Sequence, residues 1–260
     1  MKERVLQLKD ISLSFGTNEL FANLDYEFKP GIYAFSGPSG VGKSTLMRMI
    51  AGLETRYTGT ILLKEDEMVK IENGIEFKRN SITVKKPIPE IHMVHQHYKS
   101  FPWLSCLDNV LMVHKGHKVK PTTDDVKQAM EVLERLGIAD HAQKWPTQIS
   151  GGQDQRLSLA SAFVNRWSPV LLYDEPTSAL DEVNDMLVVE FIKEHQAKYN
   201  TIEIIITHEQ HVIDGLAPTI VEFSPEFRIR QKRENPTEKF LKNKPLPKGG
   251  AEDAEKEATF

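Results

Sequence analysis

Cysteine is almost absent from this chain, since Cys106 is the only one among 260 residues. A single cysteine excludes an internal disulfide framework and a zinc site built from several thiolates, and it is typical of a protein in a reducing compartment. We expect Cys106 to be a small, buried or half-buried apolar residue. The chain also lacks any apolar run of the roughly 18 residues that a membrane-spanning helix requires. Its first residues lack the pattern of a signal peptide, so we expect a cytoplasmic protein.

A large excess of charge of either sign is absent as well, because the formal net charge is −4. Nucleic-acid binding is therefore not expected, and the basic residues between 228 and 233 are expected to be solvated, with lipid headgroups or nucleic acid as alternatives. No repeat of fixed period and no heptad run is present, which excludes solenoids and coiled coils. Apolar periodicity fades towards the end, which predicts a flexible polar tail at 226–260.

Alternating apolar and polar residues predict strands in the first third of the chain. Two short strands are expected at 5–8 and 11–15. Further strands are expected within 57–94, interrupted by the charged residues 64–67 and by a turn at 72–74. This pattern favours an antiparallel sheet that is added to a larger core.

The periodicity becomes helical in the middle of the chain, where a helical subdomain is expected at about 97–167. Val126, Met130 and Leu133 share one helical face, and Gly137 is a suitable residue to end that helix. Two short apolar runs then predict strands that are buried on both faces of a parallel sheet, at Val170–Tyr173 and Ile202–Ile206.

A glycine-rich loop lies between a predicted strand at 32–35 and a predicted helix at 44–50. It matches the phosphate-binding loop (P-loop), in which glycines let backbone N–H groups approach phosphate oxygens. The residues expected to bind ATP here are Gly37, Pro38, Ser39, Gly40, Val41, Gly42, Lys43, Ser44 and Thr45. Lys43 is expected to reach the β- and γ-phosphates and Ser44 to ligate Mg²⁺, while the positive end of the helix favours phosphate. The alternative is a glycine-rich turn without a ligand.

Two adjacent carboxylates, Asp174 and Glu175, follow the predicted strand at 170–173. Parallel strands present their carboxyl ends at the ligand crevice, so these side chains are expected to face the phosphates. Asp174 is expected to hold Mg²⁺, and Glu175 is expected to take a proton from the attacking water. The alternative is a solvated acidic turn after a core strand.

The segment Ile149–Gln153 resembles the signature motif of the ATP-binding cassette (ABC) family. The resemblance continues in the family's order through Gln96, Pro176–Asp181 and Thr207–His208, and it covers about residues 3–222. It implies an α/β fold, namely a P-loop NTPase (RecA-like) core with an antiparallel β subdomain and an inserted helical subdomain. The ABC ATPase domain is accordingly expected at 1–225.

The resemblance also implies roles for residues outside the P-loop. Phe15 is similar to the aromatic residue that stacks on adenine, with an ordinary core or surface aromatic as the alternative. Gln96 is similar to the glutamine that contacts Mg²⁺ and the attacking water, and His208 is similar to the histidine that contacts the γ-phosphate. A further set would bind ATP held by a second subunit in a head-to-tail homodimer, with Asp181 crossing the interface. This set is Ser150, Gly151, Gly152 and Gln153.

Three histidines lie close together in the sequence, at positions 92, 95 and 97. A metal site is the alternative reading, but His92 would not share a strand face with the other two, and carboxylates or cysteines at suitable spacing are missing. We do not expect a metal there. The chain departs from the family's pattern at Ile149, Ser161 and His95, none of which removes a catalytic atom, and the stretch between 59 and 91 is unusually long.

The segment after Gln96 is similar to the same region in the ATPases of nitrate, sulfonate and taurine importers. This resemblance implies that a membrane permease docks near Gln96 to Val110, with Tyr98 and Trp103 as exposed contacts, and the alternative is that they belong to the helical core. We therefore expect the ATP-hydrolysing subunit of an importer, in which MgATP closes a dimer at the inner face of the membrane and no residue touches the cargo. The alternative function is a soluble, non-transport ABC ATPase that acts as a switch on protein or nucleic acid.

Overall fold

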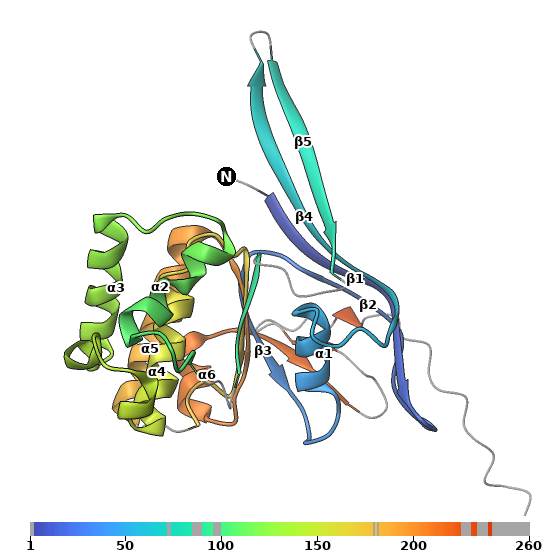
Figure 1. The fold of residues 1–260 in the computed structure, drawn as a ribbon. Coiled ribbons are helices and arrows are strands. Elements are labelled where there is room, and N and C mark those ends of the chain that lie inside the picture. Colours follow the sequence, from blue (N-terminus) through green and yellow to red (C-terminus); the bar gives the residue numbers. More distant parts are fainter. Residues whose placement is uncertain are drawn as a thin grey trace, which may run out of the picture.

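A computed structural model describes residues 3–71, 74–84, 90–95, 100–178, 180, 182–224, 230–232 and 239–240. Within these residues the strands form two sheets, one of four strands in the order β2-β1-β4-β5 and one of seven in the order β11-β10-β9-β3-β8-β7-β6 (Figure 1). The sheets pack with helices in an α/β arrangement, which confirms the predicted fold class.

The four-stranded sheet is antiparallel throughout, as predicted for the added sheet. The predicted extent of 57–94 was wrong at its end, because residues 91–94 pair in parallel with residues 170–173 and belong to the other sheet. Its strands are β1 (Glu3–Phe15), β2 (Asn18–Phe28), β4 (Thr58–Ile71) and β5 (Gly74–Thr83). The expectation of two short strands at 5–8 and 11–15 was wrong, because β1 runs through both. The pairing shifts register between Leu8 and Ile11, and Asp10 adopts a φ of 52° at this irregularity. A strand that absorbs such a bulge stays continuous although its alternation is broken.

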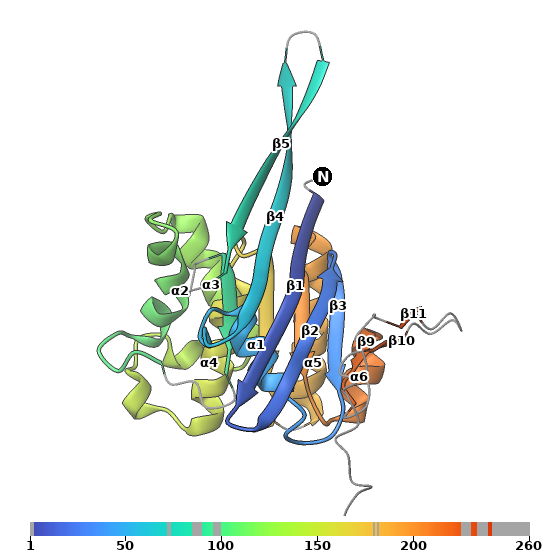
Figure 2. The ribbon, with the colours of Figure 1, turned by 90° about the vertical axis from the view of Figure 1, so that its right-hand side faces the viewer.

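The expected interruption at 64–67 was also wrong, since β4 passes through these residues without a break. The antiparallel register sets Asp66 opposite Arg79 and Glu67 opposite Lys78, so positions of opposite charge are paired. Paired opposite charges are compatible with a strand. The turn predicted at 72–74 lies outside the described residues except for Gly74. Figures 1 and 2 show that β4 and β5 continue beyond the first residue of β1 as a projecting hairpin, which we call the arm.

The seven-stranded sheet carries the parallel strands of the core. Its parallel strands are β3 (Gly31–Ser36), β6 (Ile91–Val94), β7 (Val170–Asp174), β8 (Ile202–Ile206) and β9 (Thr219–Glu222). All five residues of β8 are buried, and four of the five in β7 are, which confirms the two predicted core strands. Two short strands, β10 (Arg230–Lys232) and β11 (Lys239–Phe240), extend the sheet in antiparallel pairing.

Helices cover both faces of this sheet. On one side α1 (Lys43–Ile50) packs between the two sheets and shares a core with β1 and β2. The opposite side carries a second core formed by the remaining helices (Figure 1). They are α2 (Cys106–Gly116), α3 (Thr123–Arg135), the 3-10 turns η1 (Ala139–His141) and η2 (Pro146–Gln148), α4 (Gly151–Phe163), α5 (Glu182–Tyr199) and α6 (Gln210–Leu216).

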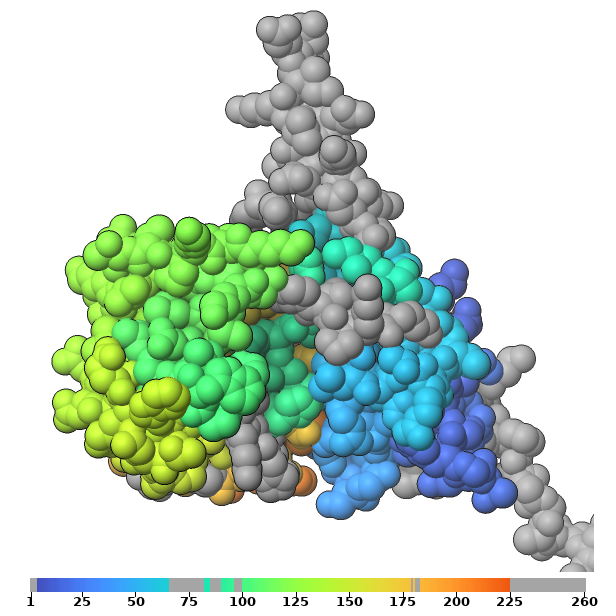
Figure 3. All heavy atoms as spheres, viewed as in Figure 1, coloured from blue at the N-terminus to red at the C-terminus, as the bar shows by residue number. Residues whose placement is uncertain are grey.

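The local signals of these helices agree with the sequence. Thr122 and Asp125 form a capping box at the start of α3, and Gly137 follows its end with a φ of 66°. Cys106 is buried, as expected for an apolar residue. Figure 3 shows the helical residues in green beside the N-terminal residues in blue on one face of the molecule.

The predicted boundaries at 1–225 and about 97–167 stay predictions. Of the predicted tail at 226–260, only β10 and β11 are described, and the rest lies outside the described residues. Among the helices of the described residues, none has the length and apolar character needed to cross a bilayer.

Candidate functional site

The P-loop connects the carboxyl end of β3 to α1, as the sequence predicted. Gly37 has a φ of 140°, and a Cβ atom there would lie 2.4 Å from the carbonyl oxygen of Phe223. Gly42 has a φ of 109°, and a Cβ atom there would lie 2.8 Å from the ring of Phe21. Both positions therefore require glycine, because any side chain would be strained and would collide with its surroundings. The loop backbone thus lies tightly against the core at the N-terminus of α1.

Lys43 folds back over this loop. Its ammonium donates hydrogen bonds to the carbonyl oxygens of Gly37 at 2.7 Å and Pro38 at 3.0 Å. Burial lowers the pKa of Lys43, while the negative charges of Glu175 and Asp174 act in the opposite direction. The ammonium is therefore held by partners that a phosphate group can replace with a stronger, charged interaction.

The two acidic residues lie at the carboxyl end of β7. The hydroxyl of Ser44 donates a hydrogen bond to Oδ1 of Asp174 at 3.1 Å. Oε1 of Glu175 lies 3.5 Å from Nε2 of His208, which follows β8. The backbone N–H of Glu175 donates to the carbonyl oxygen of Ile206 at 2.9 Å, so the end of β7 is fixed against the end of β8. Residues more than a hundred positions apart in the sequence thus meet at one edge of the sheet.

A cavity of about 280 Å³ lies at this edge. It is lined by Ser39, Gly40, Gly42, Lys43, Ser44, Thr45, Arg48, Glu175, Ile206 and His208. The structure therefore brings six of the nine predicted P-loop residues together with Glu175 and His208, while Gly37, Pro38 and Val41 do not line the cavity. Gln96 lies outside the described residues, so its predicted place in this site is not described. The cavity combines backbone N–H groups at a helix N-terminus, a buried cation and a carboxylate, which is suited to binding and hydrolysing a phosphate anhydride.

The predicted signature residues form the start of a different helix. Ser150 is the N-cap of α4: its hydroxyl accepts a hydrogen bond from the N–H of Gln153, whose side-chain oxygen accepts the N–H of Ser150 in return. This capping box confirms that a helix begins at these residues. Among the described residues that line the cavity, none comes from 150–153. One chain therefore carries the P-loop and the signature at separate places.

Phe15 ends β1 with 42% of its surface exposed. The guanidinium of Arg56 lies 5.2 Å from the centre of its ring. This exposure excludes a core role for Phe15. The ring is available for stacking, but it does not line the phosphate cavity within the described residues.

Two of the three neighbouring histidines, His92 and His95, lie within the described residues. His92 lies on β6 with its Nε2 3.5 Å from the hydroxyl of Ser161. Burial, with smaller effects of His195, His117 and His95, lowers the pKa of His92 to about 4. Burial also lowers the pKa of His95, whereas His97 lies outside the described residues. In the part of the chain that the structure describes, no group of three metal-binding side chains is present.

The predicted docking segment presents a large aromatic side chain. Trp103 is 66% exposed, so it does not belong to the helical core. Its ring lies 5.4 Å from that of Phe101, and the side chain of Asn109 bonds to the backbone of this loop on both sides of Trp103. The loop is therefore held in one shape around an exposed tryptophan. Tyr98 lies outside the described residues.

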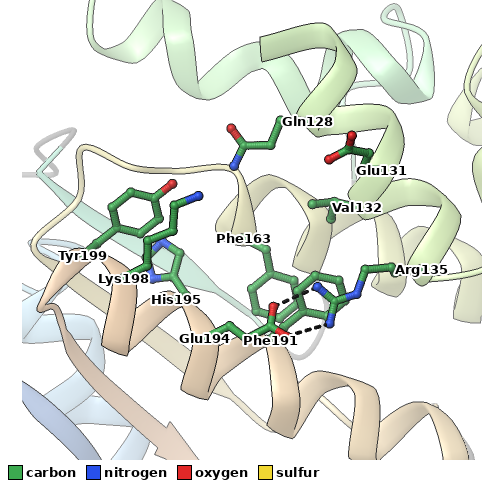
Figure 4. Close-up of a pocket in the computed structure, with 10 residues that line it drawn as sticks. All are labelled: Gln128, Glu131, Val132, Arg135, Phe163, Phe191, Glu194, His195, Lys198 and Tyr199. Atoms are coloured by element: carbon green, nitrogen blue, oxygen red, sulfur yellow. Dashed lines mark hydrogen bonds and ion pairs between the residues drawn. The ribbon is translucent and has the colours of Figure 1, made fainter. Parts of the chain in front are cut away.

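A second cavity, of about 190 Å³, lies between α3 and α5 (Figure 4). The guanidinium of Arg135 points across it to the carboxylate of Glu194, 2.8 Å away, and stacks 3.9 Å above the ring of Phe191. Glu190 lies 3.3 Å from the same guanidinium. Because this cation is already matched by two carboxylates, we interpret the contact as a tie between α3 and α5.

Sequence reasoning missed two residues at the site. Arg48 lines the phosphate cavity from the last turn of α1. Gln155 donates from its side chain to the carbonyl oxygens of Pro176 at 2.7 Å and of Glu175 at 3.4 Å. The only signal in the sequence is that Gln155 follows the signature by two positions, which does not reveal a partner some 20 residues away.

Comparisons with known proteins agree with this geometry. Residues 21–178 match the family described as ABC transporter. The glutamate/aspartate import ATP-binding protein GltL of Escherichia coli is 32% identical to this chain, over 86% of this chain and 89% of GltL. The aliphatic sulfonates import ATP-binding protein SsuB of Albidiferax ferrireducens is 32% identical, over 83% of this chain and 69% of SsuB.

A solved structure shares the fold. It is the dimeric ATP-binding cassette MJ0796 in a post-hydrolysis state with ADP and phosphate, which aligns with a TM-score of 0.65 at 24% identity. The alignment covers 84% of this chain and 93% of that one. The two chains therefore share an overall fold.

Proposed function

The chain belongs to the ABC transporter family of ATPases, and from this premise we propose that it is the ATP-hydrolysing subunit of an importer. In this proposal MgATP closes a dimer of the chain, and closure acts on a separate membrane permease. The observation that carries the proposal is the cavity of about 280 Å³, where P-loop residues meet Glu175 and His208. The import functions named for GltL and SsuB support the direction of transport.

Binding of the triphosphate is assigned to the P-loop. Backbone N–H groups between Gly37 and Gly42 and the N-terminus of α1 would surround the phosphate oxygens. Lys43 would exchange its two carbonyl partners for the β- and γ-phosphates. Phe15, at the exposed end of β1, would stack on the adenine ring.

Ser44 and Asp174 fit a magnesium ion. Their oxygens lie 3.1 Å apart, and a hydroxyl with a carboxylate is a hard-oxygen donor set of the kind that Mg²⁺ uses beside phosphate groups. Gln96 is proposed as a further ligand. When bound, the ion would neutralise charge that develops on the phosphates.

Glu175 is proposed as the general base. Its carboxylate would accept a proton from the attacking water. His208, whose Nε2 lies 3.5 Å from Oε1 of Glu175, would contact the γ-phosphate. Proton transfer to a positioned base contributes about 10²- to 10⁴-fold to a rate. Most of the remaining acceleration would come from orientation and charge stabilisation.

A second copy of the chain would complete each site. The N-terminus of α4, with Ser150, Gly151, Gly152 and Gln153, would cap ATP bound to the P-loop of the other copy, and Asp181 would cross the interface. Support comes from the separation of the two elements in one chain. Such a head-to-tail pair follows two-fold symmetry.

The permease is proposed to dock near Gln96 to Val110, which would place the protein at the inner face of a membrane. The exposed ring of Trp103 would enter a pocket of the partner. Replacement of Trp103 by Asp is expected to abolish this association while ATP binding is kept. Loss of both would show that Trp103 has a structural role instead.

The decisive experiment uses the Glu175→Gln chain. This variant is expected to bind MgATP but to hydrolyse it at least about 100-fold more slowly, which holds the closed state. Purification with MgATP from gently solubilised cells should recover a stoichiometric multi-span membrane protein. The Glu175→Gln, Trp103→Asp double variant is the matched control and should recover none. Recovery of a soluble protein or nucleic acid in place of a membrane protein would overturn the transport proposal.

A further inference from the structure

Gln155, the fifth residue of α4, contacts the peptide that follows the proposed base. Its side-chain Nε2 lies 2.7 Å from the carbonyl oxygen of Pro176 and 3.4 Å from that of Glu175. An amide nitrogen donates two hydrogen bonds, so one side chain can hold both oxygens. Gln155 thus connects the helix that carries the signature to the backbone that carries Glu175.

The backbone of Glu175 needs such support. Its φ is 50°, a left-handed conformation that residues other than glycine seldom adopt. Conformations of this kind persist only where the surroundings fix them. On the amino side, the N–H of Glu175 donates to the carbonyl oxygen of Ile206 at 2.9 Å. On the carboxyl side, the N–H of Ser178 reaches the carbonyl oxygen of Glu175 at 3.4 Å, and Gln155 adds a side-chain contact to the same oxygen at 3.4 Å.

The preceding residue of α4, Asp154, contacts the docking segment. The hydroxyl of Ser100 donates to Oδ1 of Asp154. Ser100 stands immediately before the loop that exposes Trp103. Two consecutive residues of α4 therefore bond to different segments, Asp154 to the docking segment and Gln155 to the backbone of Glu175 and Pro176.

We propose that Gln155 is a positioning residue for Glu175, through which the placement of α4 sets the orientation of the catalytic carboxylate. When α4 moves with the docking segment, the carbonyl oxygens of Glu175 and Pro176 follow the Gln155 amide. The alignment of the base then depends on the position of α4. This inference rests on the proposed function, because it takes Glu175 as the base.

The test compares two substitutions of Gln155 that differ in one property. Gln155→Met keeps an unbranched side chain of similar size and helix propensity but has no N–H donor. Gln155→His keeps an N–H donor at the same reach, because Nε2 of histidine and Nε2 of glutamine are separated from Cβ by the same number of bonds. Hydrolysis of MgATP is measured for each, with KM for ATP and the melting temperature.

Gln155→Met is expected to lower kcat about tenfold, the rate equivalent of one lost hydrogen bond, with KM for ATP changed less than about twofold. Gln155→His is expected to recover kcat to within about threefold of the native chain. The melting temperatures of the two variants should agree. An unchanged kcat in Gln155→Met, or an equal loss of kcat in both variants, would overturn the inference.

Glu175→Gln, measured in parallel, separates this inference from the proposed function. If Glu175→Gln is inactive and Gln155→Met is as active as the native chain, the positioning role fails and the base remains. If Glu175→Gln hydrolyses ATP at the native rate, the assignment of the base fails, and the inference about Gln155 falls with it.

Discussion

Acidification is expected to destabilise the folded chain through His92. The imidazole lies on β6 beside Ser161, and its pKa in the folded protein is lowered to about 4 from an ordinary value of 6.5. Between these two values the unfolded chain binds a proton that the folded chain excludes. His92 therefore leaves the free energy of unfolding unchanged well above pH 6.5 and lowers it progressively as the pH falls from 6.5 towards 4.

The size of the effect follows from the two pKa values. Each pKa unit corresponds to about 1.4 kcal/mol, so His92 should remove about 2 kcal/mol of unfolding free energy at pH 5 and about 3 kcal/mol at pH 4. Burial is the main cause, and smaller electrostatic effects of His195, His117 and His95 act in the same direction. For a protein of ordinary stability, this is a large fraction of the total.

The assay is urea unfolding of the native chain and of His92→Gln between pH 7.5 and 4. Glutamine stays neutral over this range and can still bond to the hydroxyl of Ser161. Other titrating groups affect both proteins, so the difference between the two curves isolates His92. Relative to pH 7.5, the unfolding free energy of His92→Gln should exceed that of the native chain by about 2 kcal/mol at pH 5 and about 3 kcal/mol at pH 4. Parallel curves at every pH would refute the argument that burial excludes the proton.

Three further predictions concern the other contacts. Gly37→Ala is expected to abolish ATP binding and lower the melting temperature, because its Cβ would lie 2.4 Å from the carbonyl oxygen of Phe223. Normal binding of a fluorescent ATP analogue would show that the loop has room for a side chain at this position. Arg135→Met should lower the unfolding free energy by only about 1 kcal/mol, because its ion pairs are exposed and the main loss is the stacking on Phe191. A loss of several kcal/mol in urea unfolding would show that the ion pairs stabilise the fold more than exposed pairs usually do. Ser44→Ala should raise the Mg²⁺ concentration for half-maximal hydrolysis about tenfold, and an unchanged Mg²⁺ dependence would remove Ser44 from the ion's ligands.

The sequence was most informative where one local pattern fixes one local structure. The P-loop spacing predicted a strand, a tight loop and a helix, because only glycine adopts the backbone seen at Gly37 and Gly42. The start of α4 is equally local, since the reciprocal bonds between Ser150 and Gln153 need no distant residue. The buried strands β7 and β8 followed from short apolar runs.

Features that depend on partners far away in the sequence were not predictable. The bulge near Asp10 looked like the end of a strand, because the alternation breaks there while the pairing to β2 and β4 continues. The charged residues 64–67 looked like a loop because their opposite strand was unknown. The partner of Glu203 was not predictable either: its buried carboxylate lies 2.8 Å from Nδ1 of His195. Gln155 belongs to the same class, since its partners are set by packing alone.

The arm formed by β4 and β5 makes the molecule easy to modify. The last pair between β1 and β4 joins Glu3 to Asp66, and in the described residues beyond it β4 and β5 pair only with each other. Because the two strands run antiparallel, removing matched residues from each would shorten the hairpin and leave the pairing of Leu63 with Ile82 unchanged. The arm is thus a handle on which a spectroscopic label or a fused tag can be mounted without entering the ATPase core.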